Sequence, residues 1–263
     1  MTSSILDPST HPAVPAPASA SEGNVFIFPN PVSYASAWDL QSRLHTERML
    51  DRRPDMVLIL EHQPVYTLGR STKQPHWGGD EAALRANGTD LHRVNRGGSV
   101  TYHGPGQILL YPILRLAHHA AGPRQLVRML EEVALRVLSH WNIDGYRIEK
   151  QPGLWIMAPE PAKIASIGVR VERGVTLHGL ALNVDMDLTP FHRIHPCGLA
   201  DCRMTSMAAL RRATLSVDAV KRDLAQMFRE VFGVAWSTSA VKDIATALQE
   251  AADKAAHWCP SIV

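Results

Sequence analysis

The sequence predicts an α+β fold, a single domain in which helices flank a mixed β-sheet. Its candidate strands stand in adjacent groups with helices between the groups, whereas a doubly wound parallel sheet needs strict alternation of strand and helix. No internal repeat is apparent, and no linker rich in Pro, Gly or Ser separates two apolar regions. A chain of 263 residues is also long enough to bury one sizeable core. We therefore expect one folded domain over residues 23–236.

Both ends of the chain are expected to lie outside this domain. Residues 1–22 hold four prolines among Ala and Ser, without Phe, Trp, Tyr, Lys or Arg. Such a segment cannot bury enough apolar surface to offset the entropy lost on ordering, which predicts a disordered tail. Residues 237–263 are expected to form a C-terminal extension with helical structure.

The first half of the chain combines one long helix with several short strands. A helix is predicted after Pro31, because Tyr34, Ala37 and Leu44 recur at helical spacing. A shorter helix is expected from Asp80 to about Asn87. Short runs of aliphatic and aromatic residues bounded by turn residues predict strands at Val25–Phe28, Met56–Leu60, Val65–Leu68, Leu91–Val94 and Ile108–Leu114.

The second half contains two amphipathic helices and a β-hairpin. After Gly122-Pro123, apolar residues from Leu126 to Trp141 trace one face of a helix. Another such helix is expected after Ser216, whose hydroxyl suits an N-cap. Apolar runs between these helices predict further strands, the last two joined at Arg173-Gly174 as a hairpin: Leu154–Met157, Ile164–Val171 and Val175–Val184.

Composition narrows the class of protein. A hydrophobic fraction of 45% and a charged fraction of 20% are those of an ordinary globular protein. The formal net charge of +2 is too small to predict a nucleic-acid partner. The aliphatic run Met56–Leu60 is too short to cross a bilayer, and the first residues lack the basic and apolar regions of a secretory signal. Three cysteines form no disulfide framework, which predicts a protein of the cytoplasm.

The stretch from Arg96 to Gln107 is rich in glycine. It reads RGGSVTYHGPGQ, and its glycines allow close approach of the backbone to a ligand. Glycine turns between strands are about as good an explanation of this stretch taken alone. It matches neither a P-loop nor a dinucleotide-binding fingerprint, so nucleotide binding is not predicted.

Two strands carry polar residues among their aliphatics. Lys163 heads the apolar run KIASIGVR and is either a solvated strand end or a buried functional amine. In the run VTLHGLALNV, Gly179 indicates that another part of the molecule or a ligand approaches closely. His178, beside this glycine, can equally be a core histidine whose hydrogen bonds are satisfied.

The loop HRIHPCGL admits three interpretations. Cys197 can be a small buried hydrophobe, which is the usual fate of a free cysteine. His192, His195, Cys197 and Cys202 can form a zinc site, although their spacing matches no standard ligand pattern. Cys197, between Pro and Gly, can also be a nucleophile. The loop alone leaves all three open.

Taken together, the four stretches resemble the lipoyl(octanoyl) transferase family of lipoic acid synthesis. That family shows RGGxVTYHGPGQ, KIAxxGVR, HGxALN and PCG motifs in this order. They stand here at Arg96–Gln107, Lys163–Arg170, His178–Asn183 and Pro196–Gly198. The resemblance extends from roughly Val25 to Val234 and implies the mixed-sheet fold of biotin and lipoate protein ligases.

The resemblance also implies roles for individual residues. Cys197 would be the nucleophile that carries the acyl group as a thioester, and Lys163 would stabilise its thiolate and exchange protons. Neither a metal nor another cofactor would be needed, because the donor is already a thioester. The remaining motif residues would line the substrate site: Arg96, Gly97, Gly98, Ser99, Val100, Thr101, Tyr102, His103, Ser166, Ile167, Gly168, Gly179, Leu180 and Ala181.

By the same resemblance, the octanoyl or lipoyl group would pass from acyl carrier protein to a lysine of lipoyl-domain proteins. These acceptors would include the acyltransferase subunits of 2-oxoacid dehydrogenases and the H protein of glycine cleavage. Neither nucleic acid nor a membrane is expected as a partner. A lipoate- or biotin-type protein ligase that uses ATP is the first alternative. A zinc-stabilised acyl-protein binding module without catalytic activity is the second.

Overall fold

Short apolar runs bounded by turn residues form a nine-stranded mixed sheet with the order β12-β1-β2-β6-β10-β9-β8-β7, in which β11 also pairs with β9. The computed structural model describes residues 23–85, 88–157, 159–199, 202–233 and 235–240, together with Thr246. Pairing is parallel between β12, β1 and β2 and antiparallel from β2 through to β7. The strands are β1 (Gly23–Ile27), β2 (Asp55–Leu60), β6 (Gln107–Ile113), β7 (Tyr146–Ile148), β8 (Gln151–Met157), β9 (Pro161–Glu172), β10 (Val175–Asn183), β11 (Arg203–Met204) and β12 (Trp236–Ala240).

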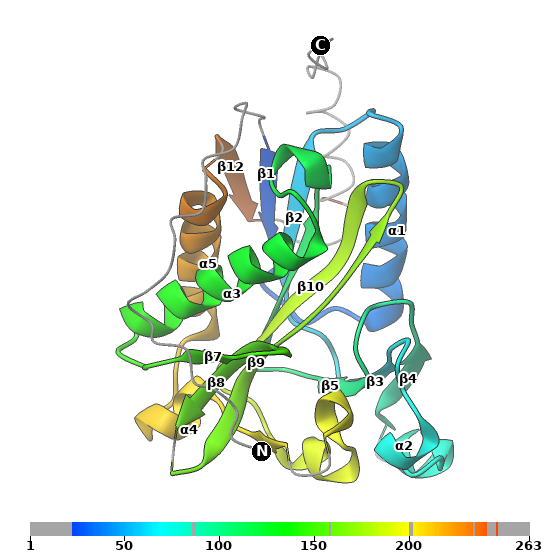
Figure 1. Ribbon diagram of the computed structural model, residues 1–263, viewed down its shortest axis with the longest axis vertical. Coiled ribbons are helices and arrows are strands. Elements are labelled where there is room, and N and C mark those ends of the chain that lie inside the picture. The colour runs from blue at the N-terminus through cyan, green and yellow to red at the C-terminus, as the bar shows by residue number, and fades with distance from the viewer. Residues whose placement is uncertain are drawn as a thin grey trace.

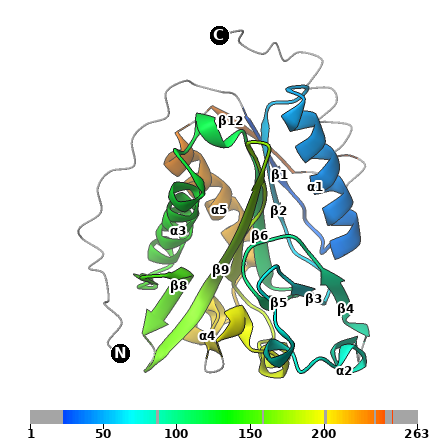
Figure 2. The same ribbon diagram turned by 45° about the vertical axis from the view of Figure 1, so that its right-hand side comes forward.

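Helices cover both faces of the large sheet (Figures 1 and 2). On one face, α3 (Pro123–His140) and α5 (Val217–Phe232) pack on side chains such as Val57 and Ile59 of β2. On the other face, α1 (Tyr34–Met49) packs on Leu58, because successive side chains of a strand point to opposite faces. Every residue of the central strands β2, β6 and β10 is therefore buried. The α+β architecture predicted from the sequence is confirmed.

Local sequence signals account for several element ends. The hydroxyl of Ser216 accepts a hydrogen bond from the backbone N–H of Ala219 and caps α5 as predicted. The hairpin between β9 and β10 turns at Arg173 and Gly174, whose φ values are 49° and 79°. Positive φ at both positions is the backbone of a type I′ turn, which matches the twist of the two strands.

A second sheet lies on the same side of the large sheet as α1 (Figure 2). It has the order β4-β3-β5 and a small apolar core of its own. Its elements are β3 (Val65–Leu68), β4 (Asp90–Arg93), β5 (Val100–His103) and the adjoining helix α2 (Glu81–Arg85). The middle of the glycine-rich stretch is thus the buried strand β5, which the sequence did not predict.

The sheet continues beyond residue 236, where the sequence placed a helical extension. Residues 236–240 form β12, which pairs in parallel with β1. This pairing satisfies the backbone hydrogen-bonding groups on the edge of β1 that faces away from β2. The ring of Trp236 lies directly against Gly23 and meets the ring of Phe228 edge to face, with centroids 5.1 Å apart. The proposed tail, residues 1–22, and the segment after Ala240 apart from Thr246 lie outside the described residues.

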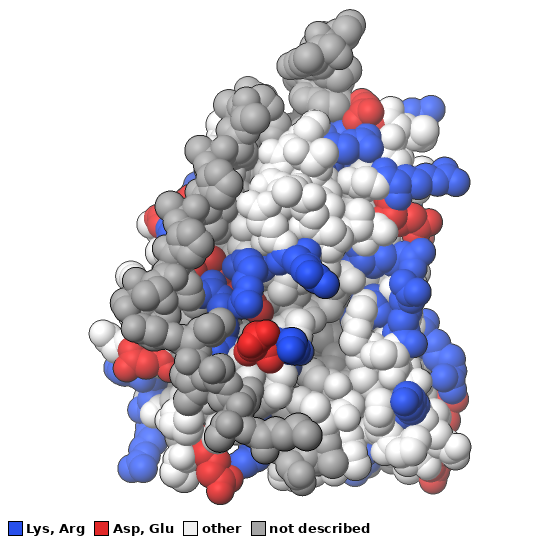
Figure 3. Space-filling model, viewed as in Figure 1, with Lys and Arg blue, Asp and Glu red and all other residues white. Residues whose placement is uncertain are grey.

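One face of the molecule carries charges of both signs. Figure 3 shows Lys and Arg interspersed with Asp and Glu on the visible face, in keeping with the small net charge of +2. Within the described part of the chain, no helix combines the length and the apolar character needed to span a membrane.

The close approach predicted at Gly179 is confirmed, and the approaching group is the neighbouring strand β6. A Cβ at Gly179 would overlap the carbonyl oxygen of Leu110 and lie 2.7 Å from the Pro112 ring. We expect Gly179→Ala to lower stability by about 2 kcal/mol, because a backbone strand must shift. Calorimetry should show a melting temperature about 4–8 °C lower. Gly122→Ala is the matched control, since a Cβ there has open space around it; an equal loss in both variants would contradict the steric explanation.

Candidate active site

Cys197 occupies a strained backbone position in the 3₁₀ turn η5 (Pro196–Gly198). Its φ of 61° and ψ of 10° lie in the left-handed region, which residues with a Cβ seldom adopt. Gly198 continues the left-handed path with φ 74°. Such strain persists only where surrounding contacts enforce it, and it is concentrated at functional sites. The sequence identified this cysteine as a candidate nucleophile but carried no sign of its backbone conformation.

Lys163 brings a buried amine to this thiol. It is the third residue of β9 and only 2% exposed. Its Nζ lies 3.2 Å from Cys197 Sγ, although the two residues are 34 positions apart in sequence, and 5.0 Å from the centroid of the Trp155 ring. The solvated-strand-end interpretation of Lys163 is therefore wrong. A thiol beside an ammonium group has the chemistry of an activated nucleophile.

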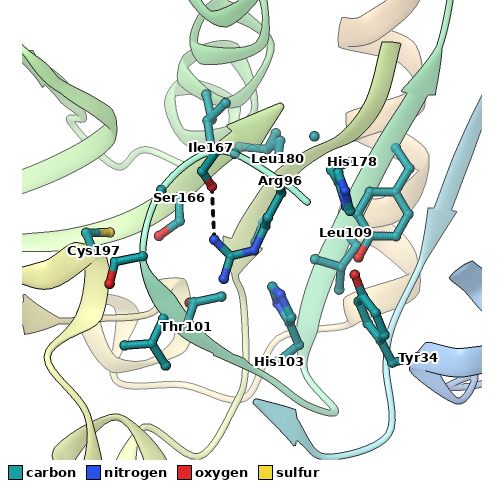
Figure 4. Close-up of a pocket in the computed structure, with 18 residues that line it drawn as sticks. Tyr34, Arg96, Thr101, His103, Leu109, Ser166, Ile167, His178, Leu180 and Cys197 are labelled. Carbon is teal, nitrogen blue, oxygen red and sulfur yellow. Dashed lines mark hydrogen bonds between the residues drawn. The ribbon is translucent and has the colours of Figure 1, made fainter. Parts of the chain in front are cut away.

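A pocket extends from Cys197 between the large sheet and the second sheet (Figure 4). All but one of the residues expected to form the substrate site line it. Tyr102 does not, because its ring packs between Tyr66 and Phe191 in the small apolar core. The pocket-lining residues that the motifs predicted are Arg96, Gly97, Gly98, Ser99, Val100, Thr101, His103, Ser166, Ile167, Gly168, Gly179, Leu180 and Ala181.

Four further residues line the pocket without having been assigned to it from the sequence: Tyr34, Leu109, Tyr111 and His178. In the sequence, the first three fit only the apolar positions of a helix or a strand. For His178 the sequence also allows a core histidine. Its Nε2 lies 2.7 Å from Asn95 Oδ1, and its ring stacks on Trp38 with centroids 5.2 Å apart.

Three buried histidines in or behind the pocket wall, His62, His103 and His178, are neutral at neutral pH. Burial, together with the nearby Arg96 and Arg170 guanidinium groups, lowers the pKa of His178 to about 3. Burial likewise lowers the pKa of His62, which lies behind Tyr111, to about 4. The pKa of His103 lies well below its ordinary value, chiefly because the ring is buried. The wall formed by these rings is therefore compatible with an apolar ligand.

A chain of amide hydrogen bonds fixes the tautomer of His103. The carbonyl of Thr205 accepts from Asn183 Nδ2, so Asn183 Oδ1 accepts from Gln107 Nε2. Gln107 Oε1 then faces His103 Nδ1 at 2.6 Å, and this nitrogen must carry the proton. The N–H of Thr205 donates to the carbonyl of Lys163. One buried network thus positions both His103 and the strand that bears Lys163.

His76 joins the two loops that flank the thiol, and the sequence had not suggested it. Its ring Nδ1 lies 2.6 Å from Ser99 Oγ in the glycine-rich stretch. Its carbonyl accepts from the N–H of His195 at 2.6 Å, and its ring packs directly on Gly198. A lone histidine between Pro75 and Trp77 has no spacing that would indicate this role.

The four residues considered for a zinc site are divided between two places, and Cys197 alone among them lines the pocket. His192, His195 and Cys202 line a second groove that shares Pro196 with the turn of Cys197. Within the described ranges, no three or more His, Cys, Asp or Glu side chains are grouped so as to hold a metal ion. Burial raises the pKa of Cys202 to about 11, so this thiol stays protonated and unreactive at neutral pH.

Comparison with known sequences identifies relatives over most of the chain. Residues 33–229 match the family model of the lipoyl protein ligase A/B catalytic domain. The octanoyltransferase of Thermobifida fusca is 43% identical over 197 residues, covering 72% of this chain and 79% of that protein. The octanoyltransferase of Xanthomonas campestris pv. campestris is 38% identical over 239 residues, covering 90% of this chain and 96% of that protein.

Solved structures agree on the fold. The bipartite lipoate protein ligase of Thermoplasma acidophilum superposes with a TM-score of 0.62 at 16% identity, covering 89% of this chain and 93% of that one. A lipoate-protein ligase A bound with ATP gives a TM-score of 0.58 at 17% identity, covering 89% and 95% of the two chains. At such low identity these structures establish the shared architecture only.

Proposed function

The chain belongs to the lipoyl protein ligase A/B catalytic-domain family, in which it is an octanoyltransferase of lipoate synthesis, and we propose that it carries the octanoyl group on Cys197. The observation that carries this proposal is the 3.2 Å contact between Lys163 Nζ and Cys197 Sγ beside a pocket with uncharged histidines. Octanoyltransferases move an acyl group from a donor to an acceptor, and a cysteine thioester divides that transfer into two easier steps.

In the first half-reaction, the Cys197 thiolate adds to the carbonyl carbon of the octanoyl thioester. The C=O bond re-forms as the carbon–sulfur bond to the donor breaks, and the departing thiolate takes a proton from Lys163. In the second half-reaction, the amine of the target lysine adds to the acyl-cysteine. Lys163, now neutral, takes the proton of that amine, and Cys197 leaves as a thiolate.

We place octanoyl-acyl carrier protein as the donor and lipoyl-domain proteins as the acceptors. The latter include the acyltransferase subunits of 2-oxoacid dehydrogenases and the H protein of glycine cleavage. The relatives' names support the octanoyl group, and the Thermoplasma ligase was solved as part of a lipoylation system with its lipoyl domain. The cytoplasmic location expected from the cysteine count stays a prediction.

A ligase that activates a free acid with ATP is the alternative reaction on this fold. Such an enzyme adenylates the acid and needs no cysteine nucleophile, so nothing in its chemistry accounts for a strained thiol paired with a buried lysine. The two reactions also differ in their requirement for nucleotide, which makes them easy to separate.

We expect an octanoyl adduct on Cys197 after the protein is mixed with octanoyl-acyl carrier protein and a metal chelator, without nucleotide. Intact mass followed by peptide mapping locates the adduct. Cys197→Ala should abolish it, and Cys202→Ala is the matched control because its thiol stays protonated. An adduct on Cys202 or Cys259 would contradict the assignment of the nucleophile. A strict requirement for ATP would place the protein among the ligases.

A further inference from the structure

Arg96 puts a buried positive charge into the wall of the pocket. The residue is 8% exposed, and no carboxylate of the described residues lies within 4.0 Å of its guanidinium. A buried charge is strongly unfavourable unless something compensates it. The four hydrogen bonds of the side chain go only to uncharged oxygens of Thr67 and Gly97.

These bonds hold the guanidinium rigidly and leave part of it free. Nε and Nη2 donate to Thr67 Oγ1 at 3.2 and 2.8 Å, and Nη2 also donates to the Thr67 carbonyl at 2.7 Å. Nη1 donates to the Gly97 carbonyl at 3.0 Å, the bond drawn dashed in Figure 4. Nη1 carries a second N–H, which has no partner among the described residues. Figure 4 shows the guanidinium reaching into the space between Ser166, Thr101 and Cys197.

Among the described residues that act on Arg96, only Cys197 can supply a negative charge during the reaction. Burial lowers the pKa of Arg96, and negative charge on Tyr34, Cys197 or Tyr111 would raise it. Burial raises the pKa of Tyr34 to about 12 and that of Tyr111 well above its ordinary value, so both phenols stay neutral. The negative charge that compensates the Arg96 guanidinium must therefore form at Cys197 or at an acyl group bound beside it.

The hydrocarbon chain of an octanoyl group forms no polar interaction with a cation, whereas the oxygen of its reacting carbonyl can accept a hydrogen bond from one. When a thiolate adds to a thioester carbonyl, the π-electron pair moves to oxygen. The carbon becomes tetrahedral, bonded to both sulfur atoms, and its oxygen becomes an oxyanion. A donor fixed in place before the reaction stabilises such a charge without reorganisation. Lys163 does not supply this donor, because its ammonium group already contacts the Cys197 sulfur.

On the basis of the proposed thioester chemistry, we infer that Arg96 is a further catalytic residue, whose guanidinium binds the oxyanion formed at the acyl carbonyl in both half-reactions. The free Nη1–H donates to the oxyanion while Thr67 and Gly97 hold the plane of the group. Collapse of the intermediate returns the electron pair to the C=O bond and expels the donor thiolate, or Cys197 in the second step. No net proton transfer to or from Arg96 is required.

The test compares binding of two octanoyl analogues to wild type, Arg96→Gln and Arg96→Lys. The Cys197 thiolate adds to heptyl trifluoromethyl ketone, whose acyl part is octanoyl, and forms a stable tetrahedral oxyanion. The octyl thioether of pantetheine has a methylene group in place of the reacting carbonyl and reports ground-state binding. For Arg96→Gln, ketone affinity and the rate of Cys197 acylation should both fall by about 100- to 1,000-fold. Thioether affinity should stay within about threefold of wild type. Arg85→Gln is the matched control, because this arginine pairs with Glu81 and Asp90 and does not line the pocket.

The outcomes separate this inference from the proposed function. If acylation falls but ketone affinity does not, Arg96 only braces the glycine-rich stretch and the inference is wrong. Thioether binding also reports whether a variant is folded. If Arg96→Gln no longer binds the thioether, Arg96→Lys provides the test. Its side chain keeps the positive charge but is shorter, so it should lose affinity for the ketone and keep affinity for the thioether. Failure of the wild-type protein to form any Cys197 adduct overturns the proposed function instead.

Discussion

Lys163→Met is expected to slow octanoyl transfer by about 100- to 10,000-fold, the usual contribution of a positioned acid–base group. Methionine keeps most of the apolar stem of lysine but removes the charge that lies 3.2 Å from the Cys197 sulfur. Without that charge the thiolate forms less readily, so alkylation of Cys197 by iodoacetamide should require a higher pH. The measurement is the alkylation rate against pH, combined with single-turnover transfer.

Lys163→Arg should separate the two roles of this lysine. A guanidinium keeps the positive charge but cannot give up a proton at accessible pH. Part of the thiolate and some acyl-enzyme should therefore be recovered, while transfer to the acceptor amine stays slow. Lys150→Ala serves as the control, since the Lys150 side chain is 88% exposed. If the alkylation profiles of wild type, Lys163→Met and Lys163→Arg coincide, Lys163 does not act on the thiol.

Much of the site could be predicted from the sequence because its chemistry is concentrated in short motifs. Lys163 and Cys197 belong to such motifs, and a polar residue in an apolar strand or a cysteine between Pro and Gly is visible without coordinates. Tyr34 was missed as a pocket residue because it also satisfies the helical periodicity of α1. His76 was missed because it acts partly through its backbone carbonyl, which any residue type possesses.

The fold shows the same division between local and non-local information. Helix α5 begins after Ser216, and the β9–β10 hairpin turns at Arg173-Gly174, because caps and turns are set by adjacent residues. By contrast, β5 and β12 are strands only through pairing with β3 and β1, which are remote in sequence. Propensity within a few residues does not encode such partners. The glycines that flank β5 also concealed it.

Acid should destabilise this protein unusually early, between about pH 6.5 and pH 4. Burial lowers the pKa of His62 to about 4 and that of His178 to about 3, from an ordinary value of 6.5. In this range the unfolded chain binds protons at these positions and the folded chain does not. Lowering the pH therefore favours unfolding, by about 1.4 kcal/mol per pH unit for each such histidine. The stabilising contribution is complete above pH 6.5 and is lost progressively below it.

The expected magnitude is large compared with the stability of a typical domain. For His62 the shift from 6.5 to about 4 spans about 2.5 pH units, which corresponds to roughly 3 kcal/mol. His178 adds a contribution of similar size, against a total stability of about 5–15 kcal/mol. Asp55 does not act in this window. Burial would raise its pKa, but His119 and Arg48 more than offset this and hold it below 3.8, so its contribution is lost only in stronger acid.

Urea unfolding measured from pH 7.5 to pH 4.5 tests this expectation. The free energy of unfolding should fall steadily below pH 6.5, and His62→Gln should reduce the slope by about 1.4 kcal/mol per pH unit. His140→Gln is the matched control, because the His140 side chain is 59% exposed. A free energy that stays constant down to pH 5 would show that these histidines are protonated within the folded protein. A positive charge on His178 would then stand in the pocket wall, and octanoyl binding should weaken over the same pH range.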